Sequence, residues 1–103
     1  MILKPGSRLR SQVCTTEVVI VRPPDGDIDL RCGGEPMIGV TETAPGDLSP
    51  APGLDTGTTL GRRYATPDPE SLEILVTKAG AGTLSVATTP LTLKDAKPLP
   101  SSD

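Results

Sequence analysis

The chain has 103 residues, with 10 basic and 13 acidic side chains, a formal charge of −3 at pH 7, and no His, Phe or Trp. This length predicts one small domain, and its core must be built from Val, Ile and Leu. The weak charge, with no basic stripe interleaved with aromatic residues, argues against nucleic-acid binding.

Targeting and membrane signals are not evident in the sequence. No stretch approaches the ~18 consecutive apolar residues of a membrane-spanning helix. The first ten residues also lack the apolar segment and the cleavage site of a secretory signal. We therefore expect a cytoplasmic protein that does not contact a membrane.

Residues 13–22 are dominated by β-branched side chains, which predicts a strand. The consecutive apolar residues 18–21 suggest that both faces of this strand are covered. Alternation over 28–32 predicts a second strand with its apolar residues on one face. A Pro-Pro-Asp-Gly sequence, typical of a turn, separates the two, and a short strand is expected at 37–40.

Residues 42–57 are rich in Pro, Gly, Asp and Thr, which predicts a loop or linker. A strand at 58–65 is expected to re-enter the fold. The clearest predicted hairpin spans 72–86, with Ile74 opposite Val86 around a loop that contains Gly.

These elements predict an all-β fold, either a small antiparallel sheet or a partly open barrel built of hairpins. The 12 Pro and 11 Gly predict long irregular loops as well. We expect an N-terminal arm at 1–10, a single β domain at 11–94 and a flexible tail at 95–103.

Catalytic motifs are incomplete. Without His, a Ser-His-Asp or Cys-His site cannot form within the chain, and the commonest metal ligand is missing. The acids of "DGDID" do not follow calcium-loop spacing, and "KAGAGTLS" lacks the Gly-Lys-Ser/Thr ending of a phosphate loop. The sequence does not predict an enzyme.

Cys14 and Cys32 are separated by 18 positions, an even number. If 13–22 and 28–32 pair as a hairpin, both thiols face the same side as diagonal neighbours about 7–8 Å apart. A disulfide needs Cα atoms within about 6.8 Å, and tetrahedral zinc needs four ligands. Buried reduced thiols, a disulfide or redox pair, and a metal site completed by a second chain all stay open.

The stretch "VCTTEVVIV…GDIDLRCGGEPM" resembles the desulforedoxin family, whose rubredoxin-like iron domains also form the N-terminal part of desulfoferrodoxins. That family has C-x-x-C, an apolar strand, a Gly-containing turn and a strand ending in C-C-G-x-x-M. Cys14 matches the second cysteine of the first pair, and Cys32 matches the last cysteine of the second. Ser11 or Gln12 stands where the first cysteine is expected, and Arg31 stands where the third is expected.

The resemblance covers residues 11–38 and implies a rubredoxin-like hairpin that brings Cys14 and Cys32 together. Two of the four iron ligands are missing, so the electron transfer of the family does not carry over.

The sequence is most consistent with a non-enzymatic accessory or binding protein that acts through a protein partner or as a homo-oligomer, with no cofactor. Arg62, Arg63 and Tyr64 are the candidate contact residues, because Arg and Tyr are favoured at interfaces. The alternative is a metal-binding or thiol-redox module centred on Cys14 and Cys32, with zinc or iron as the metal.

Overall fold

The computed structural model describes residues 2–24, 26–44, 46, 48–66 and 72–94. Within these residues the regular structure is all β, as predicted, and no helix is long and apolar enough to cross a membrane. The predicted tail at 95–103 lies outside the described residues. The strands are β1 (Arg8–Arg10), β2 (Glu17–Arg22), β3 (Leu30–Cys32), β4 (Glu35–Pro36), β5 (Ile38–Gly39), β6 (Arg63–Ala65), β7 (Glu73–Lys78), β8 (Leu84–Val86), β9 (Thr89–Pro90) and β10 (Thr92–Lys94).

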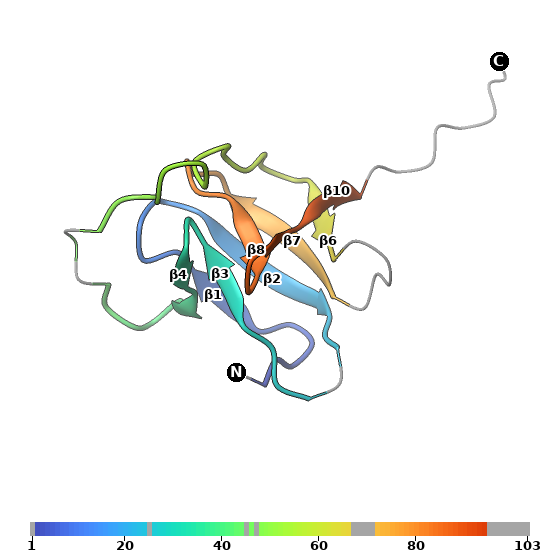
Figure 1. Ribbon diagram of the computed structural model, residues 1–103. Helices are drawn as coiled ribbons and strands as arrows, with labels where there is room; N and C mark the ends of the chain where they lie inside the picture. The colour runs from blue at the N-terminus through green and yellow to red at the C-terminus, as the bar shows by residue number, and fades with distance from the viewer. Residues whose placement is uncertain (1, 25, 45, 47, 67–71, 95–103) are drawn as a thin grey trace, which may run out of the picture.

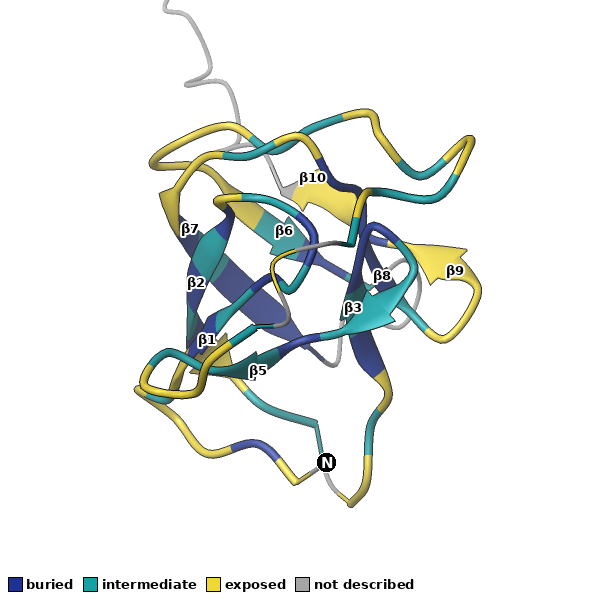
Figure 2. Ribbon diagram, turned by 90° about the vertical axis from the view of Figure 1, so that its left-hand side faces the viewer, coloured by how far each residue is buried: buried dark blue, intermediate teal, exposed yellow. Residues whose placement is uncertain are grey.

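The strands form two antiparallel sheets that do not close into a barrel. The larger sheet has the order β10-β6-β7-β2-β1-β5, and the smaller sheet has the order β4-β3-β8-β9. In Figure 1, β3 and β8 lie across β2 and β7. In Figure 2, β2 and β7 lie on one side and β3 and β8 on the other, and each of these strands contains buried residues.

The core fills the space between the two layers and consists of aliphatic side chains from both. Burial of such side chains stabilises a fold by roughly 1.5–3 kcal/mol each, so this small layer of contacts carries most of the stability. The buried cluster contains Leu3, Leu9, Val18, Ile20, Leu30, Cys32, Met37, Leu72, Ile74, Val76, Leu84 and Leu91.

Alternation predicts correctly which side chains face the core, but the expectation that both faces of β2 are covered is wrong. Val18 and Ile20 are 0% and 1% exposed, whereas Val21 is 42% exposed. The outer face of the larger sheet is open because the second layer covers only one side. A run of β-branched residues satisfies strand propensity on either kind of face.

The strands at 13–22 and 28–32 do not pair with each other. β2 lies between β1 and β7 in the larger sheet, while β3 lies between β4 and β8 in the smaller one. The turn that follows β2 therefore carries the chain from one layer to the other. The alternation of apolar and polar residues is the same for two strands paired in a hairpin and for two strands in facing sheets. The sequence pattern therefore could not distinguish these two arrangements.

The predicted hairpin at 72–86 is also wrong, for the same reason. Ile74 pairs with Ile20 and Tyr64 in the larger sheet, and Val86 pairs with Leu30 in the smaller sheet. The Gly-containing segment between β7 and β8 thus crosses between layers, and this crossing brings it over the cysteines.

Three boundary predictions can be compared with the strands. Residues 8–10 of the predicted arm form β1, which pairs with β2 and β5. The described residues of 42–57 contain no strand, as expected for a loop. The strand predicted at 58–65 begins only at Arg63.

Candidate functional site: a thiol pair between the sheets

The first half of the site is a tight loop at residues 11–16, here called the cysteine loop, which joins β1 to β2. Its ends are tied by the Ser11 N–H, which donates to the Thr16 carbonyl oxygen at 2.9 Å. The buried Ser11 Oγ accepts the N–H groups of Val13 at 3.0 Å and Cys14 at 3.2 Å. This local side-chain-to-backbone turn fixes the backbone of Cys14 and leaves its thiol half-buried.

The second half of the site is Cys32 at the end of β3. Strand alternation turns its side chain into the core, where it is 0% exposed. The Sγ atoms of Cys14 and Cys32 lie 3.8 Å apart, and both cysteines are free thiols. A disulfide bond length is about 2.05 Å, so a shift of less than 2 Å in the sulfur positions separates the two thiols from a covalent bond.

Residues 79–83, here called the covering turn, lie over the two sulfur atoms. The Gly82 N–H donates to Cys14 Sγ at 3.3 Å. The Thr15 hydroxyl donates to the Ala79 carbonyl oxygen at 2.6 Å, which ties this turn to the cysteine loop.

The covering turn needs glycine at two positions because its backbone is so close to sulfur. A Cβ at Gly82 would lie 2.8 Å from Cys32 Sγ and 3.2 Å from Cys14 Sγ. A Cβ at Gly80 would lie 2.9 Å from Cys14 Sγ. The Gly-x-Gly spacing that predicts a hairpin turn in the sequence serves instead to let the main chain contact both thiols.

A chain of hydroxyl groups leads away from Cys14. Thr16 Oγ1 lies 3.3 Å from Cys14 Sγ and 3.0 Å from Thr58 Oγ1. Thr58 Oγ1 accepts the Gly80 N–H at 3.0 Å and lies 3.4 Å from the Gly80 carbonyl oxygen, to which it donates. Hydroxyl hydrogens can rotate, so this chain can donate toward a thiolate or accept from a thiol without any movement of heavy atoms.

The two thiols have opposite acidities. Burial opposes ionisation of Cys14, but hydrogen bonds with Ser11, Thr16 and the Gly82 N–H outweigh it and lower the pKa from 9.0 to about 7. Burial raises the pKa of Cys32 from 9.0 to about 12, and the negative charge of Cys14 adds to this effect. At neutral pH one sulfur is substantially a thiolate and its neighbour is a thiol.

The pair does not fit the four-thiolate iron or zinc centre that the family resemblance implies. Of the two residues that the resemblance places at the first missing cysteine, Ser11 or Gln12, Ser11 offers Cys14 only a hydroxyl, and Arg31 lies on the face of β3 opposite to Cys32. Among the described residues no group of three or more His, Cys, Asp or Glu side chains converges on a site that could hold a metal. Two thiols alone leave half of a tetrahedral centre unfilled.

Of the predicted contact residues Arg62, Arg63 and Tyr64, the last two lie on opposite faces of β6. Arg63 points outward and its Nη1 lies 3.1 Å from Glu73 Oε2. Tyr64 packs against the core, and its hydroxyl oxygen accepts the Thr59 N–H at 3.1 Å. Successive strand residues face opposite sides, which separates the Tyr64 ring from the Arg63 guanidinium group.

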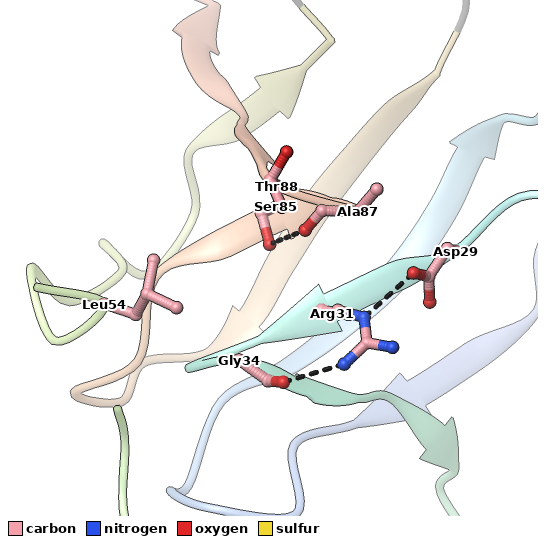
Figure 3. A pocket seen from close by; sticks show the side chains of 7 residues that line it. All are labelled: Asp29, Arg31, Gly34, Leu54, Ser85, Ala87 and Thr88. Atoms are coloured by element: carbon pink, nitrogen blue, oxygen red, sulfur yellow. Dashed lines mark hydrogen bonds and ion pairs between the residues drawn. The ribbon is translucent and has the colours of Figure 1, made fainter. Parts of the chain in front are cut away.

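A pocket of about 420 Å³ opens beside β3 and β8 (Figure 3). Arg31 projects along it, with Nε donating to Asp29 Oδ2 at 2.9 Å and Nη1 donating to the Gly34 carbonyl oxygen at 2.9 Å. The walls are formed by Asp29, Arg31, Gly34, Leu54, Ser85, Ala87 and Thr88. The pocket holds a fixed guanidinium–carboxylate pair and neither thiol, so it is separate from the cysteine site.

Sequence reasoning identified the two cysteines but missed the groups that lower the pKa of Cys14. Ser11 is noticeable in the sequence only as a substitution for cysteine in the family pattern, and Thr16 and Thr58 carry no motif. The one usable signal was the Gly-x-Gly of the covering turn, which cannot be connected to the thiols before the layers are known.

No protein-family model, no curated protein and no solved structure matches the chain significantly.

Proposed function

We propose that this chain is a thiol–disulfide redox module in which Cys14 and Cys32 alternate between two thiols and one disulfide. The observation that carries the proposal is the 3.8 Å separation between the two Sγ atoms, one half-buried and one fully buried. A pair of purely structural thiols has no need of the hydroxyl and N–H groups that surround Cys14.

The different acidities of the two thiols support different roles for them in the reaction. A thiolate is the reactive form of cysteine, and Cys14, with a pKa of about 7, supplies it near neutral pH. Cys32, with its pKa raised to about 12, stays protonated until Cys14 has reacted. Cys14 is therefore the attacking sulfur and Cys32 the resolving one.

The chemical change is a two-electron oxidation. One S–S bond forms, both S–H protons are released, and the electron pair passes to the oxidant. Reduction by a dithiol reverses each of these changes. The short sulfur-to-sulfur distance means that the layers need to shift little between the two states.

The test is an equilibrium titration of the purified chain in mixtures of reduced and oxidised dithiothreitol. We expect both free thiols to disappear together, with a mass loss of two hydrogen atoms and no change in oligomeric state. Cys14→Ser and Cys32→Ser should each abolish this transition. Two thiols that persist both in excess oxidised dithiothreitol and in excess hydrogen peroxide would contradict the proposal.

Metal analysis of the same preparation, purified without chelator, tests the zinc or iron alternative. Two thiolates from one chain could complete a tetrahedral site only with two ligands from elsewhere. The redox proposal expects no stoichiometric metal. One metal per two chains, lost in Cys14→Ser, would favour a shared metal centre instead.

An accessory role through a partner is a second proposal, and the strand order favours it. β5 and β10 end the larger sheet, and β4 and β9 end the smaller one. Unpaired edges are sites where another chain can add a strand. Co-purification from the native source tests this role, and a strictly monomeric protein without partners would contradict it.

A further inference from the structure

The surroundings of Cys14 Sγ restrict what can react with it. Ser11 Oγ, Thr16 Oγ1 and the Gly82 nitrogen each lie 3.3 Å from this sulfur, and Cys32 Sγ lies 3.8 Å away. Attack on a disulfide depends on access to the attacking sulfur as well as on its ionisation. The covering turn contacts Cys14 and leaves its side chain half-buried, so we expect a bulky disulfide to react slowly with this sulfur.

The same groups are suited to a small polar reactant. The described residues within hydrogen-bond distance of Cys14 Sγ are uncharged at that contact: two hydroxyls and one backbone N–H. They offer donors for an oxygen atom but no cation for a carboxylate. A small, uncharged, oxygen-containing oxidant matches the polarity of these neighbours.

We propose that the oxidant of the thiol pair is a small hydroperoxide, such as hydrogen peroxide, and that Cys14 passes through a sulfenic acid. This inference rests on the thiol–disulfide function proposed above and specifies its substrate class.

In the first step the Cys14 thiolate attacks the hydroxyl oxygen of the hydroperoxide. An S–O bond forms, the O–O bond breaks, and the departing oxygen leaves with the electron pair of that bond. It takes a proton from solvent to become water or an alcohol. Cys14 is now a sulfenic acid, the first and reversible level of cysteine oxidation.

In the second step the Cys32 sulfur attacks the sulfenic sulfur. An S–S bond forms, the S–O bond breaks, and the leaving hydroxyl takes the Cys32 proton to form water. Loss of the negative charge on Cys14 removes the repulsion that disfavours ionisation of Cys32, so the resolving step becomes easier once the first has occurred. A dithiol reductant, which the proposed function also requires, returns the pair to thiols.

The decisive experiment compares oxidants on the reduced full-length chain, each rate being divided by that of free cysteine at the same pH. We expect hydrogen peroxide to react faster than it does with free cysteine, and oxidised glutathione to react more slowly. The normalised rate with hydrogen peroxide should exceed the normalised rate with oxidised glutathione by about tenfold or more, because the rate depends on access to Cys14 as well as on its acidity. Dimedone should label Cys14 as a sulfenic acid in Cys32→Ser.

The covering turn supplies a variant and a matched control. Gly82→Ala places a methyl group against both sulfurs, which should displace the turn and remove the preference for peroxide. Ala81→Ser, an exposed change in the same turn, should leave that preference intact. The comparison of oxidants on the unmodified chain decides the inference even if Gly82→Ala does not fold.

The outcomes separate the two proposals. If oxidised glutathione or a protein disulfide is favoured over peroxide, the substrate class is overturned while the redox function stands. If no oxidant joins the two cysteines, both fail. If dimedone does not label Cys14 in Cys32→Ser after peroxide, the sulfenic acid step is wrong.

Discussion

At Ser11, two backbone N–H groups and one thiol meet one side-chain oxygen. The N–H groups of Val13 and Cys14 donate to Ser11 Oγ, and the Cys14 thiol donates to the same atom at 3.3 Å. Once Cys14 is ionised, the rotatable hydroxyl hydrogen of Ser11 can donate to the thiolate. Ser11 therefore shapes the cysteine loop and stabilises the thiolate with one atom.

Ser11→Ala should raise the pKa of Cys14, because the variant removes a donor to the thiolate. A rise of about one unit from about 7 would cut the thiolate fraction at pH 7 roughly fivefold. The pH dependence of iodoacetamide alkylation measures this in a Cys32→Ser background. Ser49→Ala, an exposed change, is the control, and an unmoved midpoint in Ser11→Ala would contradict the role assigned to Ser11.

At the scale of elements, the two-residue connection between β8 and β9 holds a conformational anomaly. Val86 pairs with Thr89, and Ala87 between them has a φ of 52°. Left-handed backbone costs a residue with a Cβ roughly 1–2 kcal/mol, and two-residue hairpin turns favour glycine for this reason. Ala87 also forms part of the pocket wall, and strained backbone tends to gather at binding sites.

Ala87→Gly should stabilise the fold by up to about 1 kcal/mol, because relief of the strain exceeds the added entropy of the unfolded chain. Urea unfolding of the reduced protein measures the difference. Ala79→Gly, at an exposed position without positive φ, should destabilise by about 0.5 kcal/mol instead. Equal losses in both variants would show that Ala87 is not strained.

The same scale shows where sequence reasoning succeeds and where it fails. Alternation correctly placed Leu30 and Cys32 on one face and Ile74 and Val76 on another, because side-chain direction is a local property of a strand. Strand partners are not local. A turn such as Pro-Pro-Asp-Gly can reverse the chain within a sheet or carry it to a second layer, and apolar residues face the core in both cases.

From the sequence it could be predicted only that the two thiols lie close together. The even spacing of Cys14 and Cys32 suggested diagonal neighbours in one hairpin, whereas the contact is made across two sheets. Of the groups that lower the pKa of Cys14, Ser11 and Thr16 lie in the same loop, whereas the Gly82 N–H comes from a distant segment. The contact with Gly82 depends on long-range packing, which no spacing in the sequence reveals.

For the whole molecule, the two thiols make stability depend on pH in opposite directions. The pKa of Cys14 falls from 9.0 to about 7 on folding, so its stabilising contribution is complete above pH 9 and is lost as the pH falls through 7. The pKa of Cys32 rises from 9.0 to about 12, so ionisation of the unfolded chain removes stability as the pH rises above 9. Considering the thiols alone, the reduced protein should be most stable near pH 9.

The reduced protein should therefore gain of the order of 1 kcal/mol between pH 7 and pH 9, a figure reduced for the solvent exposure of Cys14. Urea unfolding in the presence of a reductant at pH 7, 8 and 9 measures this. Cys14→Ser should lack the gain that Cys32→Ser retains. A stability that falls over this range only when Cys14 is present would reverse the sign and refute the lowered pKa.

The position of the thiol pair between layers has a consequence for motion. Cys14 belongs to a loop of the larger sheet and Cys32 to a strand of the smaller one. In the reduced state we expect the smaller, four-stranded layer to open before the larger one, so the amides of β3 and β8 would exchange with deuterium before those of β2 and β7. A disulfide would link the two layers covalently, and the amides of all four strands would then exchange only when the entire domain opens.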